Sequence, residues 1–396
     1  MNIKKTNNPV KHLKIVERHT RSSRKYSTYV GGNSEALPID LISEILKRLP
    51  AKTIALCRRV SKEWDSLLSS PPFTKSFLTV SSTRPQLLVT FEFQGKWHFF
   101  SSPQHHFDET VSVVAPDYHM GISGEWYKEI CLSANGFVYL YEKQMLKGKM
   151  ERIPVLCNPS TGQQIPLPKV RAKNNELRCF LGYDPIEKQF KVFCMTVTKY
   201  RSQRNSREHH VLTLGKGNPS WRKIDCELPH FPQNYRKGVC INGILYYAAH
   251  NNFTDMIACF DVKSENFRSI QIDYNFWTLI NYKGKLGVLV HDYTDGNQLW
   301  VLDDTEKEKW SKHILYFPDS VFWNIKSVWG TDTGEVVWAQ WRWIKPFYVY
   351  YYNVERQSVR RVEIQGIEEK VFMDPAARPD EVFTFPNHIE NLMLRQ

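Results

Sequence analysis

Hydrophobic positions divide the chain into two stretches with different periods. Between residues 35 and 79 the apolar residues recur every three or four positions, which is the spacing of one face of an α-helix. From residue 84 to residue 396 they form short β-branched and aromatic runs separated by Gly, Asn, Asp and Pro, the pattern of strands joined by tight turns. The sequence therefore predicts an α+β multidomain protein, in which a small all-α domain is followed by a long all-β domain.

The helical stretch contains signals for three short helices. Leu37-Pro38 opens the first, with Pro in the first turn and Asp40 at a position where the helix dipole favours a carboxylate. Pro50 ends this helix, a second run covers residues 53–57, and a third ends before Pro71. So small a bundle buries too little surface to be stable without help. Part of its apolar stripe is therefore expected to face a partner, and each Leu or Ile covered in this way contributes about 1.5–3 kcal/mol.

Three segments of this region resemble an F-box of the plant type: residues 37–53, residues 60–64 and residues 73–78. The resemblance implies a domain over residues 35–79 that docks on a Skp-family adaptor, which links it to a cullin-RING ubiquitin ligase. The residues at the family's adaptor-facing positions are Leu37, Pro38, Leu41, Ile45, Leu46, Leu49, Pro50, Val60 and Trp64. Cys57 stands where many relatives have an aromatic residue. The alternative is a helical hairpin that only packs on the rest of the chain.

The β-rich stretch contains an internal repeat of two halves. The first half is a hairpin turn with a following strand, and it occurs at Asn135-Gly136, Asn242-Gly243, Lys283-Gly284 and Thr333-Gly334. Asn-Gly tolerates the positive backbone torsions that tight hairpins require. The second half is an apolar strand and an Asx turn, at Asn158, Asp261, Asp303 and Asn353. In all four copies the glycine and the Asx residue are about 20 residues apart in the sequence.

Four regular units and two less regular ones add up to six. Residues 182–223 hold two hairpins between the first and second repeats, and residues 84–100 hold another around a Gln94-Gly95 turn. Four-strand units of about 40–50 residues, each closed by its neighbours, are typical of a β-propeller. We therefore expect a six-bladed propeller, with a large β-sandwich as the alternative. Residues 84–396 also resemble the F-box-associated domain, type 3, of plant F-box proteins, which implies a kelch-like fold.

Positive charge is concentrated at the N-terminus. The chain carries +12, and residues 1–34 hold eight basic residues against one acidic residue, so +7 belongs to this segment. We expect a disordered basic tail, with a nuclear import signal or a nucleic-acid-binding arm as alternatives. No run of 18 apolar residues is present, so no transmembrane helix is expected. A second basic cluster is interpreted as a solvated loop, with binding of an acidic or phosphorylated partner as the alternative. Its members are Lys199, Arg201, Arg204 and Arg207.

The sequence contains no recognisable catalytic or metal-binding pattern. The eight cysteines include no Cys-x-x-Cys pair, and we expect them to be reduced and buried. His105-His106 and His209-His210 are adjacent pairs whose side chains point to opposite faces of an extended strand, so neither pair readily shares one metal ion. No Gly-Lys pair is followed by Ser or Thr, and no Gly-x-Ser-x-Gly elbow is present. We therefore predict no catalytic residue, no cofactor and no metal.

These features and the resemblance together indicate a non-catalytic adaptor of a Skp-cullin-F-box ubiquitin ligase. Residues 35–79 are expected to bind the Skp-family subunit, and residues 84–396 the protein to be ubiquitinated, in the nucleus, the cytoplasm or both and away from membranes. One alternative is a kelch-like propeller enzyme of the copper-oxidase type, which needs Tyr and His ligands that converge on the axis. The other is a nucleic-acid-binding protein that uses the basic tail.

Overall fold

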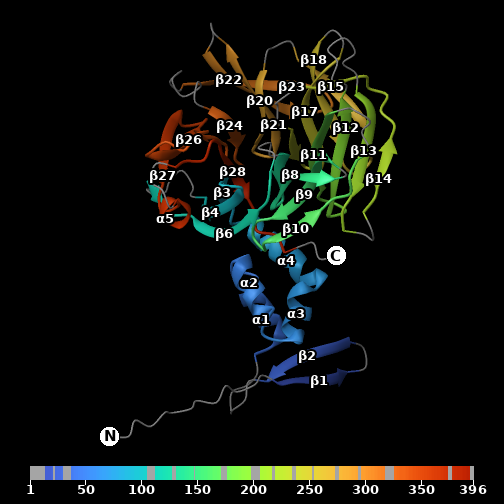
Figure 1. Cartoon of the computed structure of the whole chain (residues 1–396), viewed down its shortest axis with the longest axis vertical. Helices are drawn as coiled ribbons and strands as arrows, with labels where there is room; N and C mark the ends of the chain where they lie inside the picture. Colours follow the sequence, from blue (N-terminus) through green and yellow to red (C-terminus); the bar gives the residue numbers. More distant parts are fainter. Residues whose placement is uncertain are drawn as a thin grey trace. The chain divides into compact units, whose positions relative to one another are not determined.

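The structure is a computed structural model, drawn as a cartoon in Figure 1. It describes residues 14–20, 23–29, 37–104, 112–126, 131–146, 148–170, 176–197, 206–215, 219–233, 238–251, 254–272, 276–292, 296–316, 325–372 and 377–392. The chain forms two compact units, Met1–Ser81 and Ser82–Gln396. Among the described helices, none is long and apolar enough to cross a membrane.

A β-hairpin and helices make up the first unit. Strands β1 (Lys14–Thr20) and β2 (Ser23–Tyr29) pair antiparallel, in the segment where the sequence interpretation expects a disordered tail. The helices are α1 (Ile39–Leu46), α2 (Ala51–Cys57), α3 (Lys62–Ser69) and α4 (Pro71–Ser82). α4 is one helix more than the three expected, because Pro71-Pro72 occupies the first turn of a new helix, where proline fits well.

Local polar contacts fix the ends of these helices. Pro38 and Pro50 directly precede α1 and α2. The Ser61 hydroxyl caps α3, since its oxygen accepts a hydrogen bond of 3.3 Å from the backbone N–H of Trp64. Arg58, which follows α2, donates from Nε to the Asp65 carboxylate in α3 at 2.8 Å. This ion pair ties the end of α2 to the first turn of α3.

The second unit is a six-bladed β-propeller, as the sequence predicts. Blade 1 contains β28 (Val382–His388), β3 (Gln86–Phe93), β4 (Lys96–Pro103) and β6 (Asp117–Ser123). Blade 2 contains β7 (Cys131–Ala134), β8 (Phe137–Leu146), β9 (Lys149–Asn158) and β10 (Gln163–Pro166). Blade 3 contains β11 (Glu176–Asp184), β12 (Gln189–Val197), β13 (Ser206–Thr213) and β14 (Trp221–Ile224).

The remaining three blades follow the same order along the chain. Blade 4 contains β15 (Phe231–Pro232), β16 (Val239–Ile241), β17 (Ile244–His250), β18 (Asp255–Asp261) and β19 (Phe267–Gln271). Blade 5 contains β20 (Phe276–Tyr282), β21 (Lys285–Asp292), β22 (Gly296–Asp304) and β23 (Lys309–Leu315). Blade 6 contains β24 (Ile325–Gly330), β25 (Glu335–Gln340), β26 (Phe347–Asn353), β27 (Ser358–Ile364) and the short β5 (Val113–Val114). Helix α5 (Glu368–Val371) follows β27.

The two ends of the propeller segment close the ring of blades. β28 is the last strand of the chain and pairs antiparallel with β3, the first strand of the propeller. β5, which lies between β4 and β6 in the sequence, pairs in parallel with β27 of blade 6. Blade 1 is therefore built from both ends of the propeller segment. The neighbouring blade 6 includes β5, a short strand from the link between β4 and β6 of blade 1.

The core of the described propeller consists of six clusters of buried apolar residues, one between each pair of neighbouring blades. In blade 6, Val337 packs in the cluster shared with blade 1, and the next residue, Trp338, packs in the cluster shared with blade 5. A strand that is buried on both faces needs no polar face. This is why apolar residues run without alternation through β12 and β25.

The predicted repeat corresponds to the turns within the blades. Asn135-Gly136, Asn242-Gly243 and Lys283-Gly284 have positive φ at both positions, as a two-residue hairpin turn requires. The second half of the repeat is an Asx turn: the side-chain oxygen of Asp261, for example, accepts backbone N–H groups of the next turn at 2.8 and 2.9 Å. In blade 5 the Asx residue is Asp304 and not the predicted Asp303, because the Asp303 carboxylate pairs with a lysine across the sheet.

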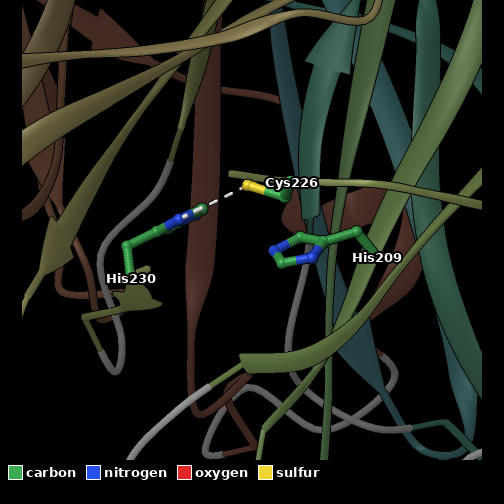
Figure 2. A group of neighbouring side chains, drawn as sticks. All are labelled: His209, Cys226 and His230. Carbon is green, nitrogen blue, oxygen red and sulfur yellow. Dashed lines mark hydrogen bonds between the residues drawn. The ribbon is translucent and has the colours of Figure 1, made fainter. Parts of the chain in front are cut away.

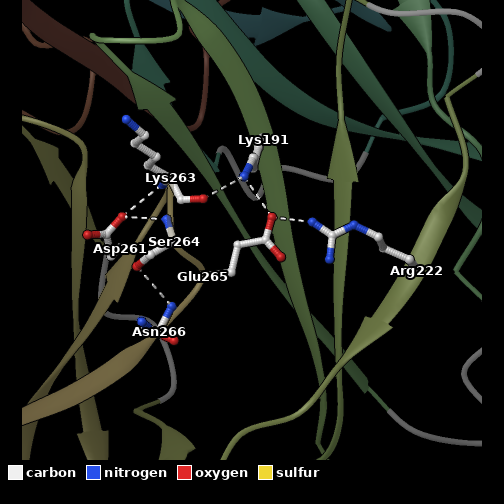
Figure 3. A network of polar contacts seen from close by, with 7 residues as sticks. All are labelled: Lys191, Arg222, Asp261, Lys263, Ser264, Glu265 and Asn266. Carbon is white, nitrogen blue, oxygen red and sulfur yellow. Dashed lines mark hydrogen bonds and ion pairs between the residues drawn. The ribbon is translucent and has the colours of Figure 1, made fainter.

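A polar network joins blades 3 and 4, as Figure 3 shows. The turn after Asp261 brings Glu265 of blade 4 to Lys191 in β12, whose Nζ donates to the Glu265 carboxylate at 2.6 Å. Arg222 in β14 pairs with the same carboxylate oxygen. Lys191 also donates to the backbone carbonyl of Lys263 at 3.4 Å. Two strands of blade 3 are thus bound to one turn of blade 4.

One pair of cysteines differs from the expectation that all are reduced. Cys179 and Cys194 lie directly opposite each other on β11 and β12, and the structure joins them by a disulfide with a Cα–Cα distance of 4.0 Å. Cross-strand positions at this distance bring the two side chains close together, and the sequence spacing of the pair does not reveal it. The free cysteines of the described residues are Cys57, Cys157, Cys226, Cys240 and Cys259.

Candidate functional site

The nine positions predicted to face an adaptor do not share one environment in the structure. Six of them are exposed: Leu37, Pro38, Leu41, Ile45, Pro50 and Val60. Leu49 and Trp64 are half-buried, and Leu46 is buried. Trp64 is held in place by the cap of α3, because its backbone N–H is the donor to Ser61. Most of the predicted set is therefore open to a partner, while Leu46 belongs to the interior.

Helix α1 separates its apolar residues onto two faces. Leu41 and Ile45 are one helical turn apart and lie on the same face. Ile45 is 54% exposed, whereas its neighbour Leu46 is 6% exposed. The buried apolar residues of α2 and α3 include Ile54 and Leu68. One stripe of α1 thus contributes to the interior, and the other presents large aliphatic side chains to solvent.

One further exposed apolar residue was not among the predicted positions. Leu56 in α2 is exposed, as are Leu41 and Val60. Its neighbours Ala55 and Cys57 are half-buried, because successive residues of a helix point in different directions and only Leu56 of the three is exposed. α2 has only seven residues, so the sequence pattern alone does not show which of its faces is buried. We refer to Leu37, Leu41, Ile45, Leu56 and Val60 as the exposed apolar set.

Several large aliphatic side chains in so short a segment leave water-exposed area that a partner can cover. Burying a whole side chain of this kind contributes about 1.5–3 kcal/mol, and because these residues are about half exposed, several must be covered together to offset the ordering costs of association. The Arg58–Asp65 ion pair ties the end of α2, which holds Leu56, to α3, and the Ser61 cap fixes the start of α3 just after Val60. A preorganised apolar surface loses less conformational entropy on binding.

The propeller contains a pocket of about 580 Å³ where the innermost strands end. All six blades contribute residues to its lining, so the pocket lies at the axis. Its polar groups come from the hairpin turns and from the ends of the neighbouring strands, and they include Asn135, Asn242, Asn281, Asp332 and Asn387. Asn281 donates to the Asp332 carboxylate at 3.2 Å. Burial nevertheless raises the pKa of Asp332 above its usual range.

The axial pocket lacks a reactive pair of side chains among its described residues. Cys240 lines it, but burial raises the pKa of this thiol to about 11, which keeps it protonated at neutral pH. Tyr183 is the tyrosine of the described lining, and no histidine is part of that lining. The copper-oxidase alternative needs Tyr and His ligands on the axis, and the described lining of this pocket does not supply them.

The predicted basic loop falls almost entirely outside the described residues. Lys199, Arg201 and Arg204 lie in the segment between β12 and β13 that the structure does not describe, and Arg207 lies in β13 at a position whose side chain is also outside the description. Its role stays a prediction. His105 and His106 lie outside the described residues as well.

Comparison with known families identifies both units. Residues 35–76 match the F-box domain family, and residues 86–389 match the family of the F-box associated beta propeller domain, which covers more than half of the chain. The chain belongs to the F-box protein family. The F-box match ends within α4, and the propeller match begins with β3 and ends just after β28. The exposed apolar set therefore lies in the F-box, and the axial pocket lies in the F-box-associated propeller.

Relatives of this F-box protein occur in Arabidopsis thaliana. The protein At1g46984 is 52% identical over 362 residues, which cover 90% of this chain and 94% of the relative. At1g46840 is 49% identical over 386 residues, covering 96% of this chain and 79% of the relative. F-box protein DOR is 41% identical over 383 residues, covering 91% and 95%. The similarity to these proteins therefore extends over both the F-box and the propeller.

Proposed function

We propose that the chain is a substrate-recognition adaptor of a Skp-cullin-F-box ubiquitin ligase, in which the F-box binds the Skp-family subunit and the propeller binds the protein to be ubiquitinated. The observation that carries the proposal is the exposed apolar set on helices α1 and α2 of the F-box and on the residues next to them. In α1, Leu41 and Ile45 face solvent although the neighbouring Leu46 is buried. Exposed apolar side chains on a fixed helix are suited to an apolar groove of a partner protein. Membership of the F-box family supports the same partner.

In this proposal the chain acts by proximity. An adaptor that holds its substrate near the ubiquitin-transferring machinery raises the effective concentration of one reactant near the other. The chain then needs no acid, base or nucleophile of its own. The protonated Cys240 thiol and the amide-rich lining of the axial pocket are consistent with a binding role for the propeller.

The substrate side of the proposal rests on the rigidity of the propeller. Its blades pack through buried clusters on both faces, so surface loops are carried by a fixed frame. The basic residues Lys199, Arg201, Arg204 and Arg207 are a candidate contact for an acidic or phosphorylated substrate. We propose that the complex works in the nucleus, the cytoplasm or both.

Co-purification with a Skp-family adaptor tests the docking step. A full-length variant with Leu41→Asp and Ile45→Asp places two carboxylates on the exposed face of α1, and we expect it to lose the adaptor. Ile186→Asp is the control, since Ile186 is also an aliphatic residue and is even more exposed than Leu41 and Ile45, but lies in a propeller turn. The control should retain the adaptor. Undiminished binding by the double variant, with an unchanged near-ultraviolet circular dichroism spectrum of the propeller, contradicts the proposal.

A further inference from the structure

Two histidines and a cysteine meet at the junction of blades 3 and 4. His209 lies in β13, and Cys226 and His230 lie in the connection between β14 and β15, as Figure 2 shows. Each residue offers one ligand atom, and these three atoms lie within 4.8 Å of one another. His209 is 7% exposed and His230 is 2% exposed, while Cys226 is half-buried.

Polar contacts orient this cluster. Nδ1 of His230 lies 2.7 Å from the carbonyl oxygen of Leu228 and 4.0 Å from Sγ of Cys226. The Cys226 thiol donates to the same carbonyl at 3.3 Å. Nε2 of His230 lies 2.6 Å from the hydroxyl of Tyr247, a fully buried residue of β17. The His230 ring is therefore held between the connection and blade 4, with its Nδ1 edge beside the thiol.

Aromatic rings surround the cluster. The ring of His209 stacks on Phe193, with centroids 5.9 Å apart and an interplanar angle of 6°. Phe267 contacts both histidine rings, at 5.5 Å from His209 and 6.0 Å from His230. The cluster thus lies in largely apolar surroundings, where the partner of a polar group contributes more than it does in water.

Metal binding requires the cluster to give up protons. The carbonyl oxygen of Leu228 can only accept, so Nδ1–H of His230 and the Cys226 thiol both donate to it. An ion that binds between these residues must displace the thiol proton and take the place of the proton on Nδ1.

We propose that His209, Cys226 and His230 bind one zinc ion at the junction of blades 3 and 4. Zinc takes imidazole nitrogen at about 2.0–2.1 Å and thiolate sulfur at about 2.3 Å in tetrahedral sites. The three ligand atoms must draw together from their present separations. Cys226 lies outside the strands, in residues 225–230 without regular structure, so this side of the site can adjust.

A second set of contacts fits this ion. A histidine that ligates a metal usually donates its other ring N–H to an oxygen, which fixes the ring. For Nδ1 of His230 to take the metal it leaves the Leu228 carbonyl, and Nε2 then carries the proton and donates to the Tyr247 hydroxyl, 2.6 Å away. The fourth position is left for water, which reaches the site beside the half-buried Cys226. The ion would cross-link β13 of blade 3 to the connection that enters blade 4.

The sequence predicts no metal here because the ligands have no recognised spacing. Cys226 and His230 are separated by three residues, and His209 lies 17 residues before Cys226. The expectation that His209 and His210 point to opposite faces agrees with their burial, since His209 is buried and His210 is half-buried. Only the packing of two blades brings His209 to the other two. The proposed ion is structural and does not depend on the proposed adaptor function.

The test uses full-length protein and cobalt as a spectroscopic probe for zinc. Metal-free protein titrated with Co²⁺ should bind one equivalent and show the d–d bands of tetrahedral cobalt together with a thiolate-to-cobalt charge-transfer band in the near ultraviolet. Added Zn²⁺ should abolish both features and raise the thermal midpoint of the propeller. Cys226→Ser should remove the charge-transfer band, and His230→Gln should weaken Co²⁺ binding by more than tenfold.

The control is Cys57→Ser, the same substitution at a half-buried free cysteine of the other unit. It should leave the cobalt spectrum unchanged. Loss of the charge-transfer band in this control instead of in Cys226→Ser would place the metal elsewhere and overturn the proposal. Wild-type protein that binds no stoichiometric Co²⁺ with a thiolate band overturns it too, whether or not the variants fold.

Discussion

The side-chain amide of Asn158 donates a hydrogen bond of 2.8 Å to the backbone carbonyl of Asn391, 233 residues later in the chain. The other side-chain atom of Asn158, Oδ1, accepts the backbone N–H groups of Ser160 and Thr161 and so forms the Asx turn after β9. Asn391 in turn donates from Nδ2 to the carbonyl of Asn135 at 2.7 Å. These bonds attach the segment after β28 to two turns of blade 2, although β28 itself belongs to blade 1.

We expect the Asn158–Asn391 contact to stabilise the closed ring. Asn158→Asp keeps the acceptor of the Asx turn but replaces the donor to Asn391 by a carboxylate oxygen. Both residues are fully buried, so the variant should lower the free energy of unfolding by about 1–3 kcal/mol. Urea unfolding measures this change. Asn391→Ala keeps the carbonyl that accepts from Asn158 but removes the bond from Asn391 Nδ2 to the Asn135 carbonyl, and it should have an effect of similar size. Because both bonds hold the same segment, the double variant should cost less than the sum. Strict additivity would show that the two residues act independently.

A second prediction concerns the Glu265 carboxylate between blades 3 and 4. Burial raises the pKa of Glu265, but the hydrogen bonds from Arg222 and Lys191 outweigh it, and the pKa is lowered overall from 4.5. A lowered pKa contributes stability that is present above pH 4.5 and is lost as the pH falls through the folded value. Glu265→Gln should therefore lower the free energy of unfolding at pH 7 by about 1.5–3 kcal/mol, the range for hydrogen bonds to a charged group.

The pH dependence distinguishes this ion pair from simple packing. Thermal midpoints of the wild type and of Glu265→Gln should differ by a constant amount near pH 7, and the difference should shrink below pH 4.5. Arg222→Gln is the milder comparison, because the Arg222 side chain is half exposed and Lys191 still neutralises the carboxylate. A difference between wild type and Glu265→Gln that persists unchanged in acid would contradict the assignment.

The blade repeat could be predicted because its signals are local. A turn such as Asn242-Gly243 carries its own positive φ angles, and Asp261 holds a turn with N–H groups two and three residues away. In blade 5 the predicted Asx residue, Asp303, is one position too early. The sequence does not distinguish Asp303 from Asp304, and only the structure shows that Asp303 pairs with Lys285 on the neighbouring strand while Asp304 forms the turn. The number of blades and the positions of most of the repeated turns followed from these local signals.

Contacts between blades could not be predicted in the same way. Lys191 and Glu265 are 74 residues apart, and nothing in either segment marks the other. The same holds for His209 with Cys226 and His230. In the F-box, the resemblance pointed to the apolar positions of α1, but Ile45 and Leu46 are adjacent residues of the same character. Only the packing of the helices decides which of the two is exposed.

A third prediction concerns the acid sensitivity of the closing strand. His388 is buried in β28, and burial together with the nearby His119 lowers its pKa to about 3 from 6.5. Below pH 6.5 the unfolded chain binds a proton that the folded chain does not, so stability falls as the pH drops from 6.5 toward 3. Burial lowers the pKa of His98 to about 4 and acts in the same direction.

Chemical unfolding between pH 7 and pH 4 measures this effect. The free energy of unfolding of the wild type should decline steadily over the range, and in His388→Leu the decline should be shallower because one titrating group is gone. The two curves are compared by slope, since the substitution itself also changes stability at pH 7. Equal slopes would mean that His388 is protonated in the folded protein without penalty.

The last prediction separates docking from folding within α1. Leu46 is buried and Ile45 is exposed, although the two residues are adjacent. Leu46→Ala removes buried methyl groups and should destabilise the helical unit by about 2–5 kcal/mol, seen as faster amide hydrogen exchange in α1, α2 and α3. Ile45→Ala should change exchange little, since exposed substitutions stay within about 0.5 kcal/mol, yet it should weaken binding to the Skp-family adaptor. The reverse pattern, with normal binding by Ile45→Ala and unfolding of its helices, would show that α1 uses this face for its own packing.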